Sequence, residues 1–160
     1  YSSGFFNLFL ATMKKEALIR ACRALLEERI AECHRTLAEL QADLTSESKS
    51  TAGDKHETGR AMLHLEAEKE AARLNEAESL LQQWDRIDFV SAPAEVMPGA
   101  WVQTGEGHFL ISVPLGRVVI SDIVFFLISP VSPFGKLLQH KRKGDTVHLN
   151  GKAFTILGIH

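Results

Sequence analysis

Two carboxylates, Asp54 and Glu57, stand three residues apart in STAGDKHETGRA (residues 50–61), a small polar stretch with almost no bulky apolar side chain. Carboxylate oxygens of this kind suit Mg²⁺, and two acids can also orient a water for attack on a phosphate. The same spacing is that of a helix cap. With Asp54 at the N-cap, Glu57 would complete a capping box, which contributes about 1 kcal/mol. The two interpretations are compatible, because a capping carboxylate can still face solvent.

The other reactive side chains form no comparable set. The seven histidines are scattered, and no C-x-x-C or H-E-x-x-H pattern predicts a zinc site. The sequence has no glycine-rich phosphate loop and no nucleophile elbow. A short basic run, KRK at residues 141–143, lies close to Lys136 and His140. Such a run is typical of a solvated helix end, and a contact to phosphate or to an acidic protein is the alternative.

Two long helical patterns must position the acidic stretch. Residues 14–45 contain no Gly or Pro and carry apolar residues in two seven-residue series, which predicts a coiled-coil seam. A polar turn is predicted at residues 45–53, and a second helix at about residues 54–84. Two helices of similar length joined by a short turn predict an antiparallel hairpin. The seam positions are Ile19, Leu26, Cys33 and Leu40 with Ile30, Leu37 and Leu44 in the first helix, and Leu63, Ala77 and Trp84 with Ala67, Leu74 and Leu81 in the second.

The C-terminal part predicts a small β-sheet. Pro and Gly interrupt residues 85–100, and beyond them apolar residues alternate or form short blocks between Gly-containing turns. Asn150-Gly151 between two such blocks is a strong hairpin signal, and residues 133–140 have the length of one short helix with proline at its start. The strand candidates are residues 101–104, 108–113, 117–120, 123–128, 146–149 and 153–159.

The predicted organisation is therefore α+β. Residues 13–86 form the hairpin, with its acidic tip near residues 46–58. The remaining parts are expected to be a disordered N-terminal extension at residues 1–12, a linker at residues 87–95 and a β domain at residues 96–160.

Charge and composition exclude several classes of protein. The 160 residues carry 18 basic and 20 acidic side chains, a net charge of −2, which provides no bulk attraction to nucleic acid or to an anionic membrane. The apolar run near the N-terminus is shorter than the ~20 residues of a membrane span and lacks the features of a signal peptide, so we expect a cytoplasmic protein. Cys22 and Cys33 fall in one predicted helix about 16 Å apart. This separation excludes a disulfide between them and indicates a reducing compartment.

Two motifs and their order resemble the bacterial Gre (GreA/GreB) transcript cleavage factors. In the acidic stretch, the Gly, Asp and Glu of GDKHE match the family's GDxxEN motif. In the β part, ISPVSPFGKLL (residues 128–138) followed by KGD (residues 143–145) is similar to the family's IS…SPIGkALlGkkvGD signature. The resemblance covers residues 14–159 in order and spacing. It implies a coiled-coil hairpin followed by an FKBP-like, twisted antiparallel β domain with one short helix.

The resemblance also implies a mechanism. The β domain would dock at the rim of the RNA polymerase secondary channel, and the hairpin would bring Asp54 and Glu57 to the polymerase active site. There the acids would help to bind a Mg²⁺ shared with the polymerase and to position water, so that the polymerase cleaves the 3′ end of backtracked RNA. The chain would be a monomeric stimulator rather than an enzyme, would hold no cofactor tightly alone, and would meet RNA and DNA at the nucleoid through the elongation complex. The candidates for partner binding are Ser132, Pro133, Phe134, Gly135 and Lys136.

The acidic stretch departs from the family pattern around Glu57. Thr58 replaces the family's Asn, Gly59 and Arg60 replace an Ala and an acidic residue, and His56 replaces the usual Lys. Three alternatives therefore stay open: a regulator that occupies the polymerase channel without stimulating cleavage, an FKBP-like prolyl isomerase or chaperone with a helical arm, and a coiled-coil oligomerisation module. The aromatic residues that an isomerase pocket would need are expected in the core instead: Trp101, Phe109, Phe125, Phe126, Phe134 and Phe154.

Overall fold

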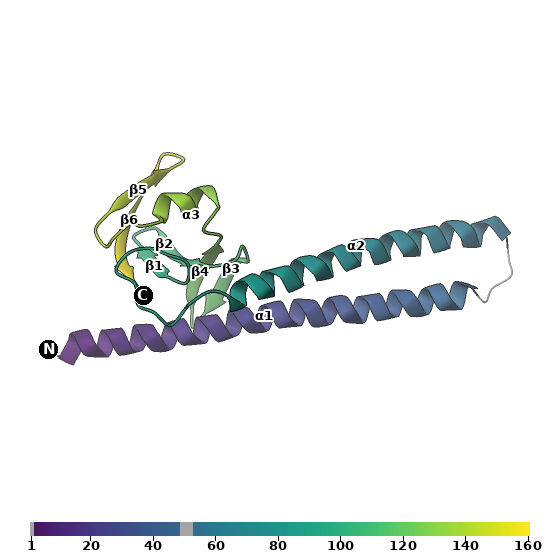
Figure 1. Cartoon of the computed structure of the whole chain (residues 1–160), viewed down its shortest axis with the longest axis horizontal. Helices are drawn as coiled ribbons and strands as arrows, with labels where there is room; N and C mark the ends of the chain where they lie inside the picture. The colour runs from purple at the N-terminus through teal and green to yellow at the C-terminus, as the bar shows by residue number, and fades with distance from the viewer. Residues whose placement is uncertain (1, 49–52) are drawn as a thin grey trace. The chain divides into compact units, whose positions relative to one another are not determined.

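Three helices and six strands form the part of the chain that the structure describes, residues 2–48 and 53–160 of a computed structural model (Figure 1). The predicted α+β class is confirmed. Contacts divide the chain into a hairpin unit, Ala24–Gln82, and a sheet unit, Tyr1–Arg23 with Gln83–His160. This division differs from the predicted one, because the first turns of the first helix belong with the sheet. Within the described residues, no helix carries an apolar stretch long enough to cross a membrane.

The helices α1 (Ser2–Ser48) and α2 (Gly53–Asp85) pair antiparallel in the hairpin unit (Figure 1). The predicted seam is confirmed there, because its positions are buried or half-buried while the residues between them are mostly exposed. One seam position breaks the apolar pattern. Glu70 is 9% exposed, and its carboxylate pairs with Arg73 at 3.3 Å. The buried apolar residues of the hairpin unit are Leu26, Cys33, Leu40, Leu44, Ala77 and Leu80, and all but Leu80 are predicted seam positions.

The first helix is longer than predicted at both ends. Residues 2–12, expected to be disordered, are helical, and Ala11 at the end of this segment is buried in the sheet unit. The turn predicted from residue 45 starts later, because Thr45 stays helical and its hydroxyl donates to the Gln41 carbonyl at 2.9 Å. The rest of the predicted turn, residues 49–52, lies outside the described residues.

The strands of the sheet unit are β1 (Trp101–Thr104), β2 (Gly107–Ile111), β3 (Gly116–Ile120), β4 (Ile123–Ile128), β5 (Thr146–Leu149) and β6 (Lys152–Ile159). They form one sheet in the order β3-β4-β2-β1-β6-β5. The predicted antiparallel sheet is wrong for one pair, because β2 and β4 run parallel and the sheet is mixed. The chain passes through β3 at the sheet edge before β4 returns beside β2, and this crossover sets the parallel direction.

Local turn chemistry explains the hairpin at the other end of the sheet. Asn150 and Gly151 between β5 and β6 both have positive φ, 53° and 76°. Two consecutive positive φ values are those of a type I′ turn, which matches the twist of the flanking strands. The hairpin predicted from Asn-Gly is therefore confirmed.

Both faces of the sheet bury apolar side chains. One face packs against the short helix α3 (Pro133–Leu138), with Phe109, Val147 and Ile156 in its core. The opposite face carries Trp101 and Phe125, whose ring centroids are 5.4 Å apart in an edge-on arrangement. Alternation along each strand divides the side chains between these two cores.

Candidate functional site

The two acids of the polar stretch lie in the first turns of α2, at the end of the hairpin unit where the chain reverses. The helix begins at Gly53, so Asp54 is its second residue and Glu57 lies one turn further. Residues three apart face the same side of a helix. The Glu57 side chain is exposed, and the side chain of Asp54 lies outside the described residues.

The start of α2 corrects the capping prediction. A capping box on Asp54 requires a non-helical backbone at that residue, but α2 already includes Gly53 and Asp54. The position before the helix is residue 52, which falls outside the described part of the chain. Asp54 therefore lies in the first turn of α2 rather than at the N-cap.

The residues that follow Glu57 keep α2 helical. The helix continues without a break through Thr58, Gly59 and Arg60, so the glycine causes no interruption. Gly59 is half-buried and borders an open hollow of about 460 Å³ between the two helices. The other residues around the hollow are Asp43, Ser46, Met62, Leu63 and Glu66.

Within the described residues, no three His, Cys, Asp or Glu side chains lie close enough together to hold a metal ion. Mg²⁺ prefers six oxygen ligands and commonly takes only one or two of them from carboxylates of one protein. Within the described residues, Glu57 is an exposed carboxylate near the start of α2, and no set of metal ligands surrounds it.

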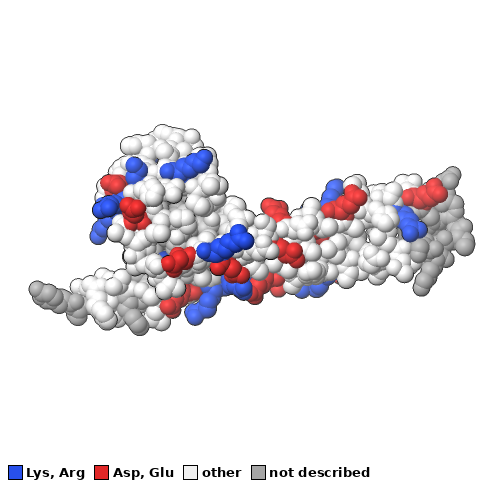
Figure 2. All heavy atoms as spheres, viewed as in Figure 1, with Lys and Arg blue, Asp and Glu red and all other residues white. Residues whose placement is uncertain are grey.

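Charges along the hairpin are mixed in sign (Figure 2). Arg35 pairs with Glu28 at 2.9 Å along α1, and His34 lies 3.9 Å from Glu78 of α2. On the face that Figure 2 shows, acidic and basic side chains are interspersed along the described part of the hairpin.

Two of the five predicted partner-binding residues hold α3 in place. Ser132 caps the helix: its hydroxyl accepts a hydrogen bond from the Gly135 backbone N–H at 3.0 Å and donates one to the Ser129 carbonyl at 2.6 Å. Gly135 is buried, and a Cβ added there would lie 2.1 Å from the same carbonyl oxygen. The local geometry of this turn thus requires both residues.

Phe134 also belongs to the core, because its ring centroid lies 4.9 Å from that of Phe109 and 4.7 Å from that of Phe154. The remaining two candidates, Pro133 and Lys136, are exposed and available to a partner. Sequence reasoning missed two exposed apolar neighbours in this segment, Val131 (73% exposed) and Leu137 (39%). The signal for Val131 was a β-branched residue placed in a turn, outside any strand period.

The basic run after α3 is partly neutralised. Glu95 lies 2.9 Å from His140 Nδ1 and 3.8 Å from the Arg142 guanidinium. The helix ends at Leu138, and the basic residue in its last turn is Lys136. The favourable interaction with the helix dipole therefore applies to Lys136, whereas residues 141–143 lie beyond the helix.

The aromatic residues of the sheet unit pack on one another. Trp101, Phe109 and Phe125 are buried, which confirms their predicted place in the core. Phe126 departs from the prediction, because it is 38% exposed on β4. The clustering of these rings weakens the argument for an isomerase pocket.

Comparisons with known proteins yield likenesses to three chains of solved structures. No protein-family model matches the chain, and no curated protein matches it. One similar solved structure is described as "Structure of the transcription factor Gfh1". It is 20% identical, covers 86% of this chain and 92% of its own, and has a TM-score of 0.35. A likeness of this size carries no conclusion about function.

Proposed function

We propose that this chain is a Gre-type transcription elongation factor that enters the secondary channel of RNA polymerase and stimulates cleavage of backtracked RNA. The observation that carries the proposal is the exposed Glu57 one turn after Asp54, at the reversing end of a self-contained helical hairpin. The resemblance of the two sequence motifs supports it independently.

The dimensions of the hairpin unit suit such a role. From Ala24 to Ser48, α1 spans about 37 Å at ~1.5 Å per residue. The chain's own second helix fills the seam, so the hairpin needs no second copy for its stability. We therefore expect sedimentation to show a monomer, whereas a stable dimer would favour the oligomerisation module.

The chain's own contribution would be to hold two carboxylates on one helix face. Asp54 and Glu57 would accept hydrogen bonds from a water and orient it toward the phosphate of the RNA 3′ end. Mg²⁺, when bound between these acids and the polymerase, supplies Lewis acidity toward the phosphate oxygens. The other catalytic groups belong to the polymerase, so we expect the isolated chain to be inactive.

Arg60 favours a second candidate, a channel regulator that does not stimulate cleavage. It follows Glu57 by three residues on the same helix, and both side chains are exposed. A cation at this spacing can pair with the carboxylate and reduce its availability to a metal. An Arg60→Glu variant would stimulate cleavage more than wild type if this neutralisation limits activity.

The test is a cleavage assay on a backtracked elongation complex of the cognate polymerase. We expect the wild-type chain to accelerate release of short 3′ RNA fragments in the presence of Mg²⁺. Asp54→Ala and Glu57→Ala should abolish the acceleration, while Glu68→Ala, an exposed acid further along α2, should not. Circular dichroism and polymerase binding serve as controls for all three variants. A wild-type chain that binds the polymerase but leaves cleavage unchanged would establish the regulator instead.

A further inference from the structure

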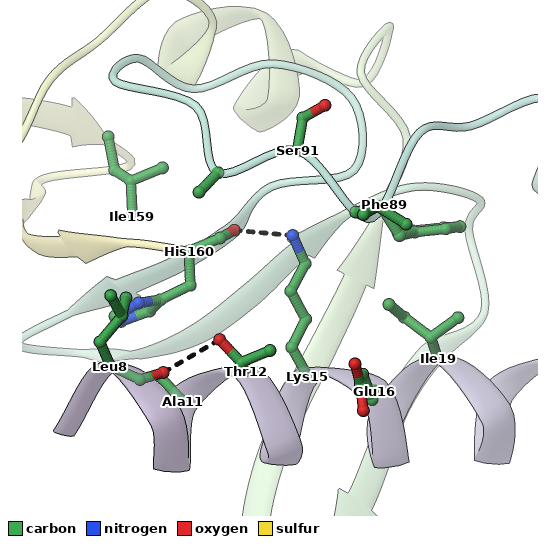
Figure 3. A pocket seen from close by; sticks show the side chains of 12 residues that line it. Leu8, Ala11, Thr12, Lys15, Glu16, Ile19, Phe89, Ser91, Ile159 and His160 are labelled. Carbon is green, nitrogen blue, oxygen red and sulfur yellow. Dashed lines mark hydrogen bonds between the residues drawn. The ribbon is translucent and has the colours of Figure 1, made fainter. Parts of the chain in front are cut away.

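A cavity of about 150 Å³ lies within the sheet unit (Figure 3). The first turns of α1, the segment that follows α2 and the end of β6 enclose it. Apolar walls of this extent can hold a molecule the size of benzene. The apolar side chains around it include Leu8, Ala11, Ile19, Phe89 and Ile159.

One charged side chain is buried at this cavity. Lys15 is 6% exposed, and its Nζ donates to the His160 carbonyl at 2.9 Å, as Figure 3 shows. An ammonium group has three donors, and among the described residues this carbonyl is the acceptor that the structure assigns to Lys15. The amine thus sits against apolar walls with donor capacity left over.

The surroundings of Lys15 raise the fraction of neutral amine above that of an exposed lysine. Burial lowers the pKa of Lys15 to about 8, although the charge of Asp88 acts in the opposite direction. The Asp88 carboxylate is itself held by the Val90 backbone N–H at 2.9 Å and by the Ser91 hydroxyl. A desolvated lysine of this kind is a nucleophile near neutral pH.

We propose that this cavity binds a small apolar aldehyde and that Lys15 captures it as an imine. The Nζ lone pair attacks the carbonyl carbon to form a carbinolamine. The carbonyl oxygen then leaves as water with the two protons of the amine, so that the aldehyde and the amine yield the imine and one water. No oxidant or reductant takes part.

The charges at the cavity favour an uncharged ligand. Glu16 borders the cavity, and Asp88 lies close enough to Lys15 to interact with its charge. Both carboxylates would repel a carboxylate ligand, whereas an aldehyde places only a neutral carbonyl beside them. The apolar walls favour a ligand with a hydrocarbon chain.

The expected selectivity follows from the fraction of neutral amine. At pH 7.5, a pKa of about 8 leaves about a quarter of Lys15 neutral, against about one in a thousand for a pKa of 10.5. A lower pKa also reduces intrinsic nucleophilicity, so we expect a rate advantage of at least about 10-fold rather than the full ratio. Lys14, exposed on the same helix, is the internal control.

The experiment treats the full chain at pH 7.5 with pentanal and sodium cyanoborohydride, and peptide mass spectrometry measures labelling at each lysine. We expect Lys15 to be labelled at least about 10-fold faster than Lys14, with saturation as pentanal increases. Ala11→Leu fills the cavity and should reduce labelling of Lys15 toward that of Lys14. Lys15→Arg, which keeps a hydrogen-bond donor to the His160 carbonyl, should show no fast labelling at position 15. Glyoxylate, a charged aldehyde, should show no preference.

Two results would overturn the proposal. In one, Lys15 is labelled no faster than Lys14. In the other, Ala11→Leu, shown to be folded by circular dichroism, keeps the full rate, so that the cavity plays no part. Neither result would bear on the polymerase assay, because that assay tests Asp54 and Glu57 and not the residues of the cavity.

Discussion

Gly135→Ala tests whether the signature segment around α3 serves the fold rather than a partner. A Cβ at this buried position would lie 2.1 Å from the Ser129 carbonyl oxygen and 3.0 Å from the Pro130 Cα. Both atoms are backbone, so no side-chain rotation relieves the clash. The carbonyl must retreat by about 1 Å before the contact becomes tolerable.

That movement has a cost that can be worked out from the contacts. The Ser129 carbonyl accepts from both the backbone N–H and the hydroxyl of Ser132, so its displacement loosens the cap of α3, worth about 1 kcal/mol. Strain from the inserted methyl adds about 1–3 kcal/mol. The higher helix propensity of alanine offsets about 1 kcal/mol. We therefore expect Gly135→Ala to lower the free energy of unfolding by about 1–3 kcal/mol.

Urea unfolding followed by tryptophan fluorescence measures this change, because Trp101 is buried in the same unit. The matched control is Gly105→Ala, since no atom lies within 4 Å of a Cβ at that position. We expect the control to stay within about 0.5 kcal/mol of wild type. If Gly135→Ala is as stable as the control, the claim that this segment serves the fold is refuted.

Three further predictions concern titration and ion pairing. Burial raises the pKa of Cys22 to about 12 and also raises the pKa of Cys33, to which a hydrogen bond with Glu70 adds. Neither thiol should therefore react with Ellman's reagent at pH 8 until urea is added. Because the pKa of Lys15 is lowered in the folded chain, the unfolded chain binds more protons than the folded one between pH 8 and 10.5. The free energy of unfolding of wild type should therefore rise with pH across this window, and Lys15→Met should lack the part of the rise that Lys15 causes. Arg23 and Asp85 form a two-point ion pair at 3.1 and 3.2 Å but are about half exposed, so a double-mutant cycle should give less than about 1 kcal/mol, falling with added salt.

Local patterns in the sequence predicted most of the secondary structure. The bounds of β1 and β4 agree with the structure to the residue, because turns on both sides limit each apolar run. The type I′ hairpin at Asn150-Gly151 followed from two residues that tolerate positive φ. Signals of this kind act over a few residues, so a single sequence contains them.

The errors came from contacts between distant residues. The parallel pairing of β2 and β4 depends on where the chain crosses the sheet, and strand periodicity carries no information on that. The N-terminal helix and the burial of Lys15 depend on packing against the end of β6, about 145 residues away in the chain. Glu70 likewise occupies a seam position that its charge would place at the surface.

The positions of the two candidate acids follow from the sequence, and their role stays a prediction. The sequence located Asp54 and Glu57 at the start of the second helix, and the structure confirms the exposure of Glu57. The assignment of Ser132 and Gly135 to a partner came from the motif alone. The motif could not reveal that the Ser132 hydroxyl caps α3, or that Gly135 lies too close to the Ser129 carbonyl to carry a Cβ.

The rate of RNA cleavage in a stalled, backtracked elongation complex tests the central proposal most directly, with Glu57→Gln compared against wild type. The substitution keeps the size of the side chain and removes its charge, and Glu68→Gln controls for charge elsewhere on α2. We expect wild type and Glu68→Gln to accelerate cleavage at least about 10-fold, whereas Glu57→Gln binds the complex and leaves the intrinsic rate unchanged. Equal acceleration by Glu57→Gln and wild type, or no acceleration by wild type, would contradict the proposed function.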